Sequence, residues 1–92
     1  MTPEFHARWM SRERAEWSKR KGLLGSAILL ETFNGYIIVE PANGELGDGP
    51  ILSREEAEYE LTPVWYTGPK ARLREARQRL GLDVEALASS RG

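Results

Sequence analysis

The sequence contains no cysteine and a single histidine, His6, among its 92 residues. Without cysteine the chain cannot form disulfides or thiolate metal sites, and one histidine with carboxylates is a poor set of zinc ligands. The chain also lacks a nucleophile–base pair, a phosphate-binding glycine loop and paired carboxylates in an apolar setting. We therefore expect no catalytic, metal or cofactor site, and we expect that the protein is not an enzyme.

Long hydrophobic runs are missing as well. The longest apolar run, residues 27–30, is far too short to span a bilayer, and the first ten residues contain no apolar segment of the signal-peptide type. We expect a cytoplasmic protein without membrane contact. The length predicts one domain over residues 1–88, followed by a flexible tail over residues 89–92.

Neither sign of charge dominates, since the formal net charge is −1 at pH 7. The charges nevertheless form blocks: residues 1–22 carry six Lys or Arg against three acids, residues 23–63 one against eight, and residues 64–92 six against three. Attraction between segments of the same chain explains such blocks, and so does a surface for a partner. Both explanations are open at this point.

Residues 27–40 hold the densest run of β-forming residues, with Asn34-Gly35 near the middle. Asn-Gly is the preferred pair for a type I′ turn, so the run predicts a β-hairpin in which Thr32 faces Ile37 and Leu30 faces Val39. Side chains alternate between the two faces. The predicted core face comprises Ile28, Leu30, Thr32, Ile37 and Val39. The other face, half apolar and open to a partner if nothing covers it, comprises Leu29, Glu31, Phe33, Tyr36, Ile38 and Glu40.

Residues 3–21 are predicted to form a long helix before the hairpin. Thr2 would cap it and Pro3 would take its first position, while Gly22 would end it. At 100° per residue, four large apolar side chains share one broad face of this helix, namely Phe5, Trp9, Met10 and Trp17. We expect the two indoles to dock the helix on the sheet.

After the hairpin, Pro41–Gly44 predicts a turn, and the glycine-rich stretch to Pro50 predicts irregular structure. A short third strand is expected at Leu46 or at Ile51-Leu52. Ser53 and Glu56 form a capping box, which predicts a short helix that ends by Thr62. Its glutamates suit a solvated face near the helix N-terminus, or alternatively an acidic docking surface.

The last long helix is predicted between Thr67-Gly68-Pro69 and Gly81. Its apolar stripe comprises Pro69, Leu73, Ala76 and Leu80. A basic flank comprises Lys70, Arg74 and Arg77. Asp83 is predicted to cap a final turn, with Leu82 and Leu87 as a hydrophobic staple. The elements together predict an α+β fold: a long N-terminal helix, an antiparallel hairpin or small three-stranded sheet, a short middle helix and a C-terminal helix.

Residues 73–88, LREARQRLGLDVEALA, resemble the opening of a Cro/repressor-type helix-turn-helix domain. In that family an L-R-x-x-R helix is followed by Gly-Leu-Ser and by a second helix that ends in Leu-Ala; here Asp83 takes the place of the serine. The resemblance implies a DNA-binding role. The recognition helix, which reads the major groove, would begin at Gly92, so we expect no sequence-specific DNA binding of this kind.

The layout of a short hairpin, a glycine-rich turn and the capped helix that begins S53-R-E-E-A57 resembles that of small accessory proteins of phages and mobile elements. Anti-CRISPR and other anti-defence inhibitors belong to that broad group. The resemblance implies a non-enzymatic protein that covers a functional surface of a host complex in the host cytoplasm.

These observations predict a small binding or inhibitory protein that docks on a protein or ribonucleoprotein partner. The alternative is a nucleic-acid-binding accessory protein, with basic helix faces along phosphates and an exposed Trp65 or Tyr66 stacked on bases. A homodimer is left open. The candidate contact residues are Glu31, Phe33, Tyr36, Glu55, Glu58, Trp65, Tyr66, Lys70, Arg74 and Arg77.

Overall fold

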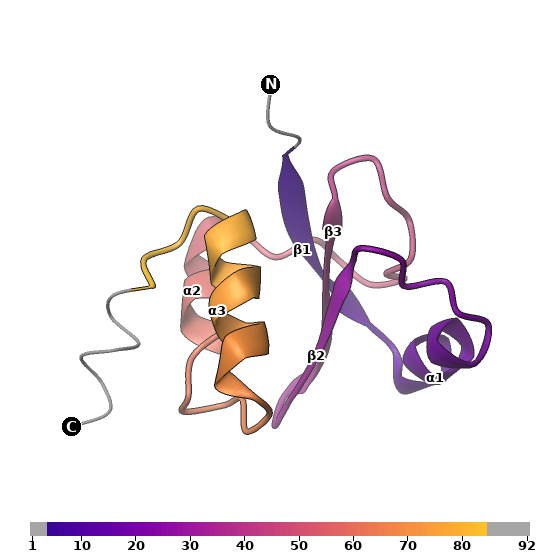
Figure 1. Cartoon of the computed structure of the whole chain (residues 1–92), viewed down its shortest axis with the longest axis horizontal. Coiled ribbons are helices and arrows are strands. Elements are labelled where there is room, and N and C mark those ends of the chain that lie inside the picture. Colours follow the sequence, from indigo (N-terminus) through magenta and orange to yellow (C-terminus); the bar gives the residue numbers. More distant parts are fainter. Residues whose placement is uncertain (1–3, 85–92) are drawn as a thin grey trace.

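A three-stranded antiparallel sheet lies at the centre of the computed structural model, which describes residues 4–84. The elements follow one another as β1 (Phe5–Met10), α1 (Arg12–Arg20), β2 (Ile28–Thr32), β3 (Gly35–Pro41), α2 (Arg54–Glu60) and α3 (Lys70–Arg79). The strand order is β1-β3-β2, so β3 is central. Helices α2 and α3 cover one face of the sheet and α1 lies on the other (Figure 1). The α+β class and the small sheet are confirmed.

The hairpin is confirmed, but its turn is Phe33-Asn34, one residue earlier than predicted. Thr32 pairs with Gly35 and Leu30 pairs with Ile37. No non-glycine residue between 4 and 84 has a positive φ, so Asn34 does not take the type I′ conformation. The Thr32 hydroxyl instead accepts the Asn34 N–H and donates to the Gly35 carbonyl, both at 3.0 Å. The partners are displaced by two positions, an even number, so each side chain keeps its predicted face.

The predicted long N-terminal helix is wrong, because residues 5–10 form strand β1. β1 pairs with β3 from Phe5 opposite Pro41 to Met10 opposite Tyr36. Phe5 and Trp9, four residues apart, share a face in a strand as well as in a helix, so their spacing does not separate the two structures. Trp9 therefore belongs to the sheet, and it packs beside the core that faces α2 and α3.

Helix α1 begins after Ser11, whose hydroxyl accepts the Arg14 N–H at 3.1 Å. It ends at Arg20, and Gly22 follows with a φ of +65°, as the predicted stop requires. Its buried residues are Ala15 and Ser18. Trp17 is half-buried, and the Arg14 guanidinium lies 4.7 Å from its ring centre. The small residues of α1, rather than the two indoles, make its contact with the sheet.

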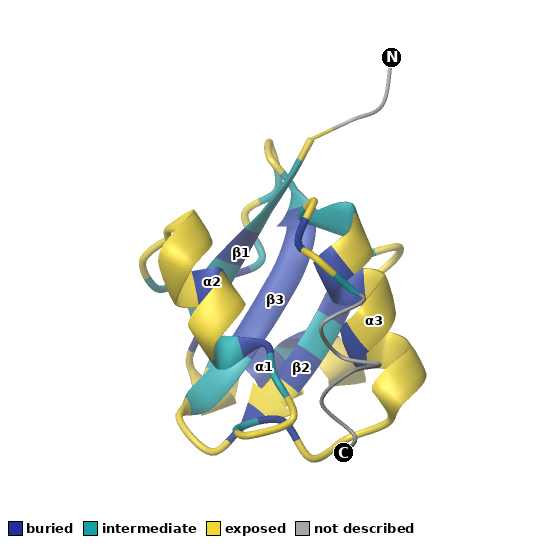
Figure 2. Cartoon of the chain, turned by 90° about the vertical axis from the view of Figure 1, so that its left-hand side faces the viewer, coloured by how far each residue is buried: buried dark blue, intermediate teal, exposed yellow. Residues whose placement is uncertain are grey.

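The main core lies between the sheet and helices α2 and α3 (Figure 2). The hairpin supplies the predicted inner face to this core, in which Leu30, Ile37 and Val39 are fully buried. The capping box of α2 is present, with the Glu56 N–H on the Ser53 hydroxyl at 3.1 Å. Helix α3 contributes Leu73 and Ala76, and Gly81 follows its end with a φ of +73°.

A smaller core covers the opposite face of the sheet, where Met10 and Ala15 enclose Ile38. On the same face Glu40 is 1% exposed. Its carboxylate is hydrogen-bonded to His6 Nε2 at 2.8 Å and accepts the Leu46 N–H at 2.9 Å. The Glu40 carboxylate therefore fastens the loop after β3 to the sheet, and His6 is its partner on strand β1.

Ile51 forms an isolated antiparallel bridge with Arg8 of β1, and Leu46 belongs to no strand. The turn at Pro41–Gly44 is confirmed by the Gly44 N–H on the Pro41 carbonyl at 2.7 Å. The final turn predicted with Leu87 and the tail over residues 89–92 lie outside the described residues.

Candidate protein-binding groove

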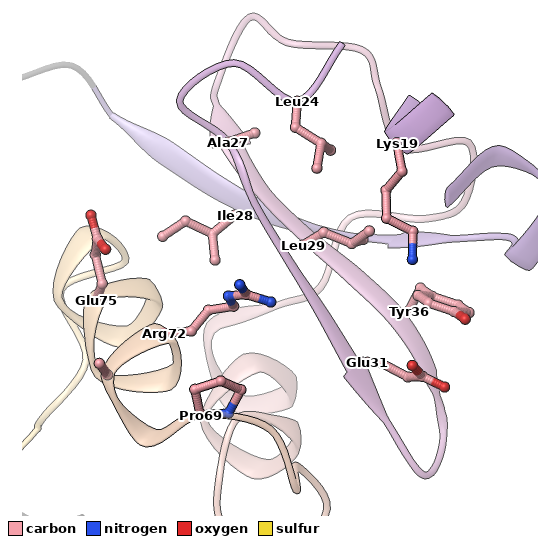
Figure 3. A pocket seen from close by; sticks show the side chains of 11 residues that line it. Lys19, Leu24, Ala27, Ile28, Leu29, Glu31, Tyr36, Pro69, Arg72 and Glu75 are labelled. Atoms are coloured by element: carbon pink, nitrogen blue, oxygen red, sulfur yellow. The ribbon is translucent and has the colours of Figure 1, made fainter. Parts of the chain in front are cut away.

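An open groove of about 560 Å³ runs along strand β2, between the α1 side of the sheet and helix α3. β2 is an edge strand, since only β3 pairs with it along its length. Figure 3 shows the strand at the floor of the groove, with α3 along one side. The α1 side contributes Lys19, Leu24, Ala27, Leu29 and Tyr36, and α3 with its N-terminus contributes Pro69, Ala71, Arg72 and Glu75.

The free edge of β2 carries backbone groups without partners. Alternate residues of an antiparallel strand direct their N–H and C=O groups to opposite edges. The Phe33 N–H points outward, because it donates to the Trp65 carbonyl at 3.1 Å beyond β2. Leu29 and Glu31 are separated from Phe33 by an even number of positions, so their N–H and C=O groups point outward as well. Within residues 4–84, no hydrogen bond engages the outward N–H and C=O of Leu29 or the N–H of Glu31.

Two cations line the groove without an ion pair or hydrogen bond to the described part of the chain: Lys19 on the α1 side and Arg72 on the α3 side. Figure 3 shows the Arg72 guanidinium directed toward β2. Glu75 is paired with Arg79 at 2.8 Å, and the Glu31 side chain lies on the face of the sheet opposite to Arg72. The α3 wall of the groove is therefore net positive.

The groove continues past Arg72 into a second hollow of about 330 Å³, which Arg72, Glu31 and Pro69 also line. Tyr66 lines this hollow and is 5% exposed, and its hydroxyl is buried without a hydrogen-bond partner. A side chain at Gly68 would collide with that hydroxyl. Burial raises the pKa of the Tyr66 phenol, and the positive charge of Arg72 lowers it by a smaller amount.

Four of the predicted contact residues meet at this site, namely Tyr66 in the second hollow and three residues of the hairpin. Tyr36 and Glu31 line the groove, and Phe33, 72% exposed, lines the second hollow at the hairpin turn. The Arg12 side chain hydrogen-bonds Tyr36, which raises the pKa of the Arg12 guanidinium. Lys19 and Arg72 could not be identified as contact residues from the sequence, because no local pattern shows that α1 and α3 flank the same strand.

The other acidic candidates and Trp65 lie outside both hollows. Glu55 and Glu58 are exposed on α2 and line neither hollow. Trp65 is half-buried and packs against Tyr59 with ring centres 5.6 Å apart. The expected exposure of Tyr66 is wrong, since its ring is buried in the main core.

The predicted basic flank of helix α3 is only partly exposed, because Arg77 is buried. Lys70 and Arg74 are exposed and line a shallow hollow on another side of the helix. Arg77 is 3% exposed; its guanidinium donates to the Leu61 carbonyl at 2.7 Å and to the Asp83 carbonyl at 2.8 and 3.0 Å. Burial lowers the pKa of Arg77. Arg77 therefore ties the chain around α3 together and presents no charge to a partner.

Residues 4–84 contain neither a candidate metal site nor a helix suited to spanning a membrane. This part of the chain contains no cluster of three or more His, Asp or Glu side chains that could hold a metal ion. Nor does any of its helices combine the length and the apolar character needed to cross a membrane. His6 and Glu40 do not line the groove.

Comparison of the chain with protein-family models, with curated proteins and with solved structures returned no match.

Proposed function

We propose that the protein is a small non-enzymatic binding protein, and that it docks on a macromolecular partner through the free edge of β2. The observation that carries this proposal is the row of backbone groups on Leu29 and Glu31 that have no hydrogen-bond partner in residues 4–84 and lie at the floor of an open groove. An extended segment can pair with such an edge as an added strand, with main-chain hydrogen bonds for affinity and flanking pockets for specificity.

The groove offers both main-chain hydrogen bonds and flanking side-chain contacts to such a segment. The outward groups of Leu29 and Glu31 offer up to three main-chain hydrogen bonds to an added strand. Side chains of that strand would alternate between the apolar α1 side, with Leu24 and Leu29, and the positive α3 side, with Arg72. In its inhibitory form, the proposal is that docking covers a functional surface of a host complex, as the resemblance to phage accessory proteins implies.

A proline substitution tests the proposal directly. Glu31→Pro removes an N–H that points away from β3, and proline is tolerated at such an edge position. Linear peptides selected from a displayed library on the wild-type protein should bind Glu31→Pro about tenfold more weakly or worse, because a hydrogen bond is lost and the ring obstructs pairing. Glu31→Ala keeps the N–H and is the matched control. If no peptide is selected, or if Glu31→Pro binds as wild type, the proposal is wrong.

Nucleic-acid binding is a second candidate, supported by the exposed Lys70 and Arg74, which lie one turn apart on α3 without an ion pair in the described chain. Binding of this kind would be lost steeply as salt rises. A mobility shift of labelled DNA or RNA at low salt that Lys70→Glu with Arg74→Glu removes would support it. The absence of any shift would exclude it.

A further inference from the structure

Arg72 and Tyr66 both line the second hollow, and each carries a polar side-chain group without a partner in residues 4–84. The Arg72 guanidinium has no hydrogen bond or ion pair within residues 4–84, and the Tyr66 hydroxyl is buried and has no hydrogen-bond partner there either. A buried hydroxyl without a hydrogen bond is unfavourable, because it has lost its hydrogen bonds to water without a replacement. Phenylalanine would fill nearly the same volume without this cost, so the hydroxyl is a candidate for contact with a group from outside the domain.

The start of α3 adds further donors to the same place. Pro69 is the N-cap residue and provides no side-chain cap, so the backbone N–H groups of Lys70 and Ala71 have no hydrogen-bond partner in the described chain. The unpaired N–H groups give a helix N-terminus a partial positive charge. Together with Arg72 and the Tyr66 hydroxyl, this end of the groove offers donors from several directions and one full positive charge. Such a set matches a carboxylate.

We propose that the segment which adds to β2 is an extended protein segment with an acidic side chain, and that Arg72 and the Tyr66 hydroxyl receive its carboxylate. This inference rests on the proposed function, because the segment is held in place by the edge of β2. Arg72 lines both the main groove and the second hollow. A segment that occupies both passes Arg72 rather than ending there, so the carboxylate is that of an Asp or Glu side chain and not of a chain terminus.

The rest of the groove is compatible with one acidic side chain on the α3 side. The Glu75 carboxylate is already paired with Arg79 at 2.8 Å. The Glu31 carboxylate lies across the strand, on the α1 side, where Arg12 is close enough to act on it electrostatically. Side chains of the added strand alternate between the two sides, so the neighbours of the acidic residue face Leu24 and Leu29. The expected segment alternates acidic or polar residues with apolar ones.

A glutamate scan of capped peptides tests the inference. The probes are labelled, acetylated and amidated peptides of alternating Val and Thr, in which one Thr at a time is replaced by Glu or by Gln. At the position that reaches Arg72, the Glu peptide should bind the wild-type protein about tenfold more tightly than its Gln counterpart, as a charge-assisted hydrogen bond implies. Arg72→Gln should remove that preference. Arg74→Gln, two residues along the same helix and outside the groove, should leave it unchanged.

Tyr66→Phe separates a binding role of the hydroxyl from a structural one. The substitution removes only the oxygen, so it should weaken the Glu peptide about threefold or more and leave thermal unfolding unchanged or slightly raised. A lower unfolding temperature with unchanged peptide affinity would show a structural hydroxyl and overturn this part of the inference.

The possible negative results distinguish a failure of this inference from a failure of the proposed function. Peptides that bind without a Glu preference, or with a preference that Arg72→Gln leaves intact, would overturn the acidic segment while strand addition to β2 stands. An Arg72-dependent preference seen only with free, uncapped C-termini would also overturn it. Failure of the scanned peptides and of all library peptides to bind would overturn the proposed function as well.

Discussion

The two edges of the sheet are treated differently by the rest of the chain. The edge of β1 is covered by the segment 47–52, which returns along it after the hairpin. The Trp9 N–H donates to the Pro50 carbonyl at 3.0 Å, the Gly49 N–H to the Trp9 carbonyl at 2.9 Å, and the Leu52 N–H to the Ala7 carbonyl at 2.8 Å. Within residues 4–84, β2 has no such cover, and only its end, at Thr32, bridges to Tyr66.

The difference shows which edge is available to a partner. An open strand edge invites unwanted pairing, and proteins usually shorten it, charge it or cover it. Segment 47–52 covers β1. β2 is only five residues long, carries the exposed Glu31 and lies between two helices. These features restrict access to a narrow segment, so β2 can stay open without pairing indiscriminately.

The largest loss of stability is expected where a backbone hydrogen bond between β2 and β3 is removed. The Leu30 N–H points toward β3, because Leu30 is out of step with the outward Leu29 and Glu31. Leu30→Pro removes this ladder donor and should destabilise the domain by about 3 kcal/mol more than Leu30→Ala, which itself costs about 2–5 kcal/mol. Urea unfolding measures the difference. Equal effects of the two substitutions would contradict the assigned strand direction.

A smaller loss is expected at the covered edge. A Cβ at Gly49 would lie 2.9 Å from the Trp9 Cβ and 3.0 Å from the Trp9 carbonyl oxygen, so Gly49→Val forces segment 47–52 away from β1. Overpacking of this kind costs about 1–3 kcal/mol, measured as a loss of unfolding free energy. Pro50→Ala, at an exposed neighbour that keeps its carbonyl acceptor, is the control and should change little. If Gly49→Val unfolds with the wild-type free energy, segment 47–52 does not pack tightly against β1.

At the open edge of β2, a proline substitution should change the stability of the unbound protein little. Glu31→Pro removes an N–H without a partner, so its unfolding free energy should fall by less than about 1 kcal/mol. In wild type, the Leu29 and Glu31 amides should exchange with solvent at least about tenfold faster than those of Trp9 and Leu52. Hydrogen exchange followed by NMR measures this contrast. Strong protection of the Glu31 amide would mean that the edge is already covered.

The smallest effect concerns the attachment of segment 47–52 to α1. The Asp48 carboxylate accepts the Ser11 N–H at 2.8 Å and the Ser11 hydroxyl at 2.7 Å, and these hydrogen bonds hold the pKa of Asp48 below its ordinary value. A lowered pKa in the folded state gives stability that is full above the unfolded pKa of about 3.9 and is lost as pH falls through the folded pKa. Asp48 is exposed, so the contribution is small.

Asp48→Asn should therefore lower the unfolding temperature slightly at pH 7. The difference from wild type should shrink as the pH falls below about 4, the ordinary pKa of an aspartate. A difference that is constant over this range would exclude the carboxylate as its source.

The sequence predicts best those elements that carry their own local signals. The hairpin faces followed from alternation along residues 28–39, the start of α2 from the Ser53–Glu56 capping box, and the ends of α1 and α3 from Gly22 and Gly81. β1 was misjudged because the four-residue spacing of its aromatics suits a strand and a helix alike. The hairpin register failed because Thr32, not an Asn-Gly turn, organises the chain reversal.

The site was only partly predictable. Tyr36, Phe33 and Glu31 were found on the hairpin, but the groove also needs Lys19 and Arg72, which come from helices far apart in the sequence. Arg77 could have been recognised as buried, since it lies four residues after Leu73 and three before Leu80, within the apolar stripe of α3. Its charge placed it on the surface in the sequence analysis, whereas backbone carbonyls satisfy its guanidinium in the interior.

The central position of β3 has a consequence for the order of folding. The β2–β3 hairpin closes over a two-residue turn, whereas β1 reaches β3 only after a long intervening segment that contains α1. Closing a long loop carries a larger entropy cost than closing a tight turn, and nonlocal pairing slows folding. The hairpin should therefore form early and β1 late. Until β1 pairs with β3, the hairpin has two open edges, one on β2 and one on β3. During folding the chain is therefore exposed to aggregation also on the β3 side, which β1 and segment 47–52 cover in the native protein.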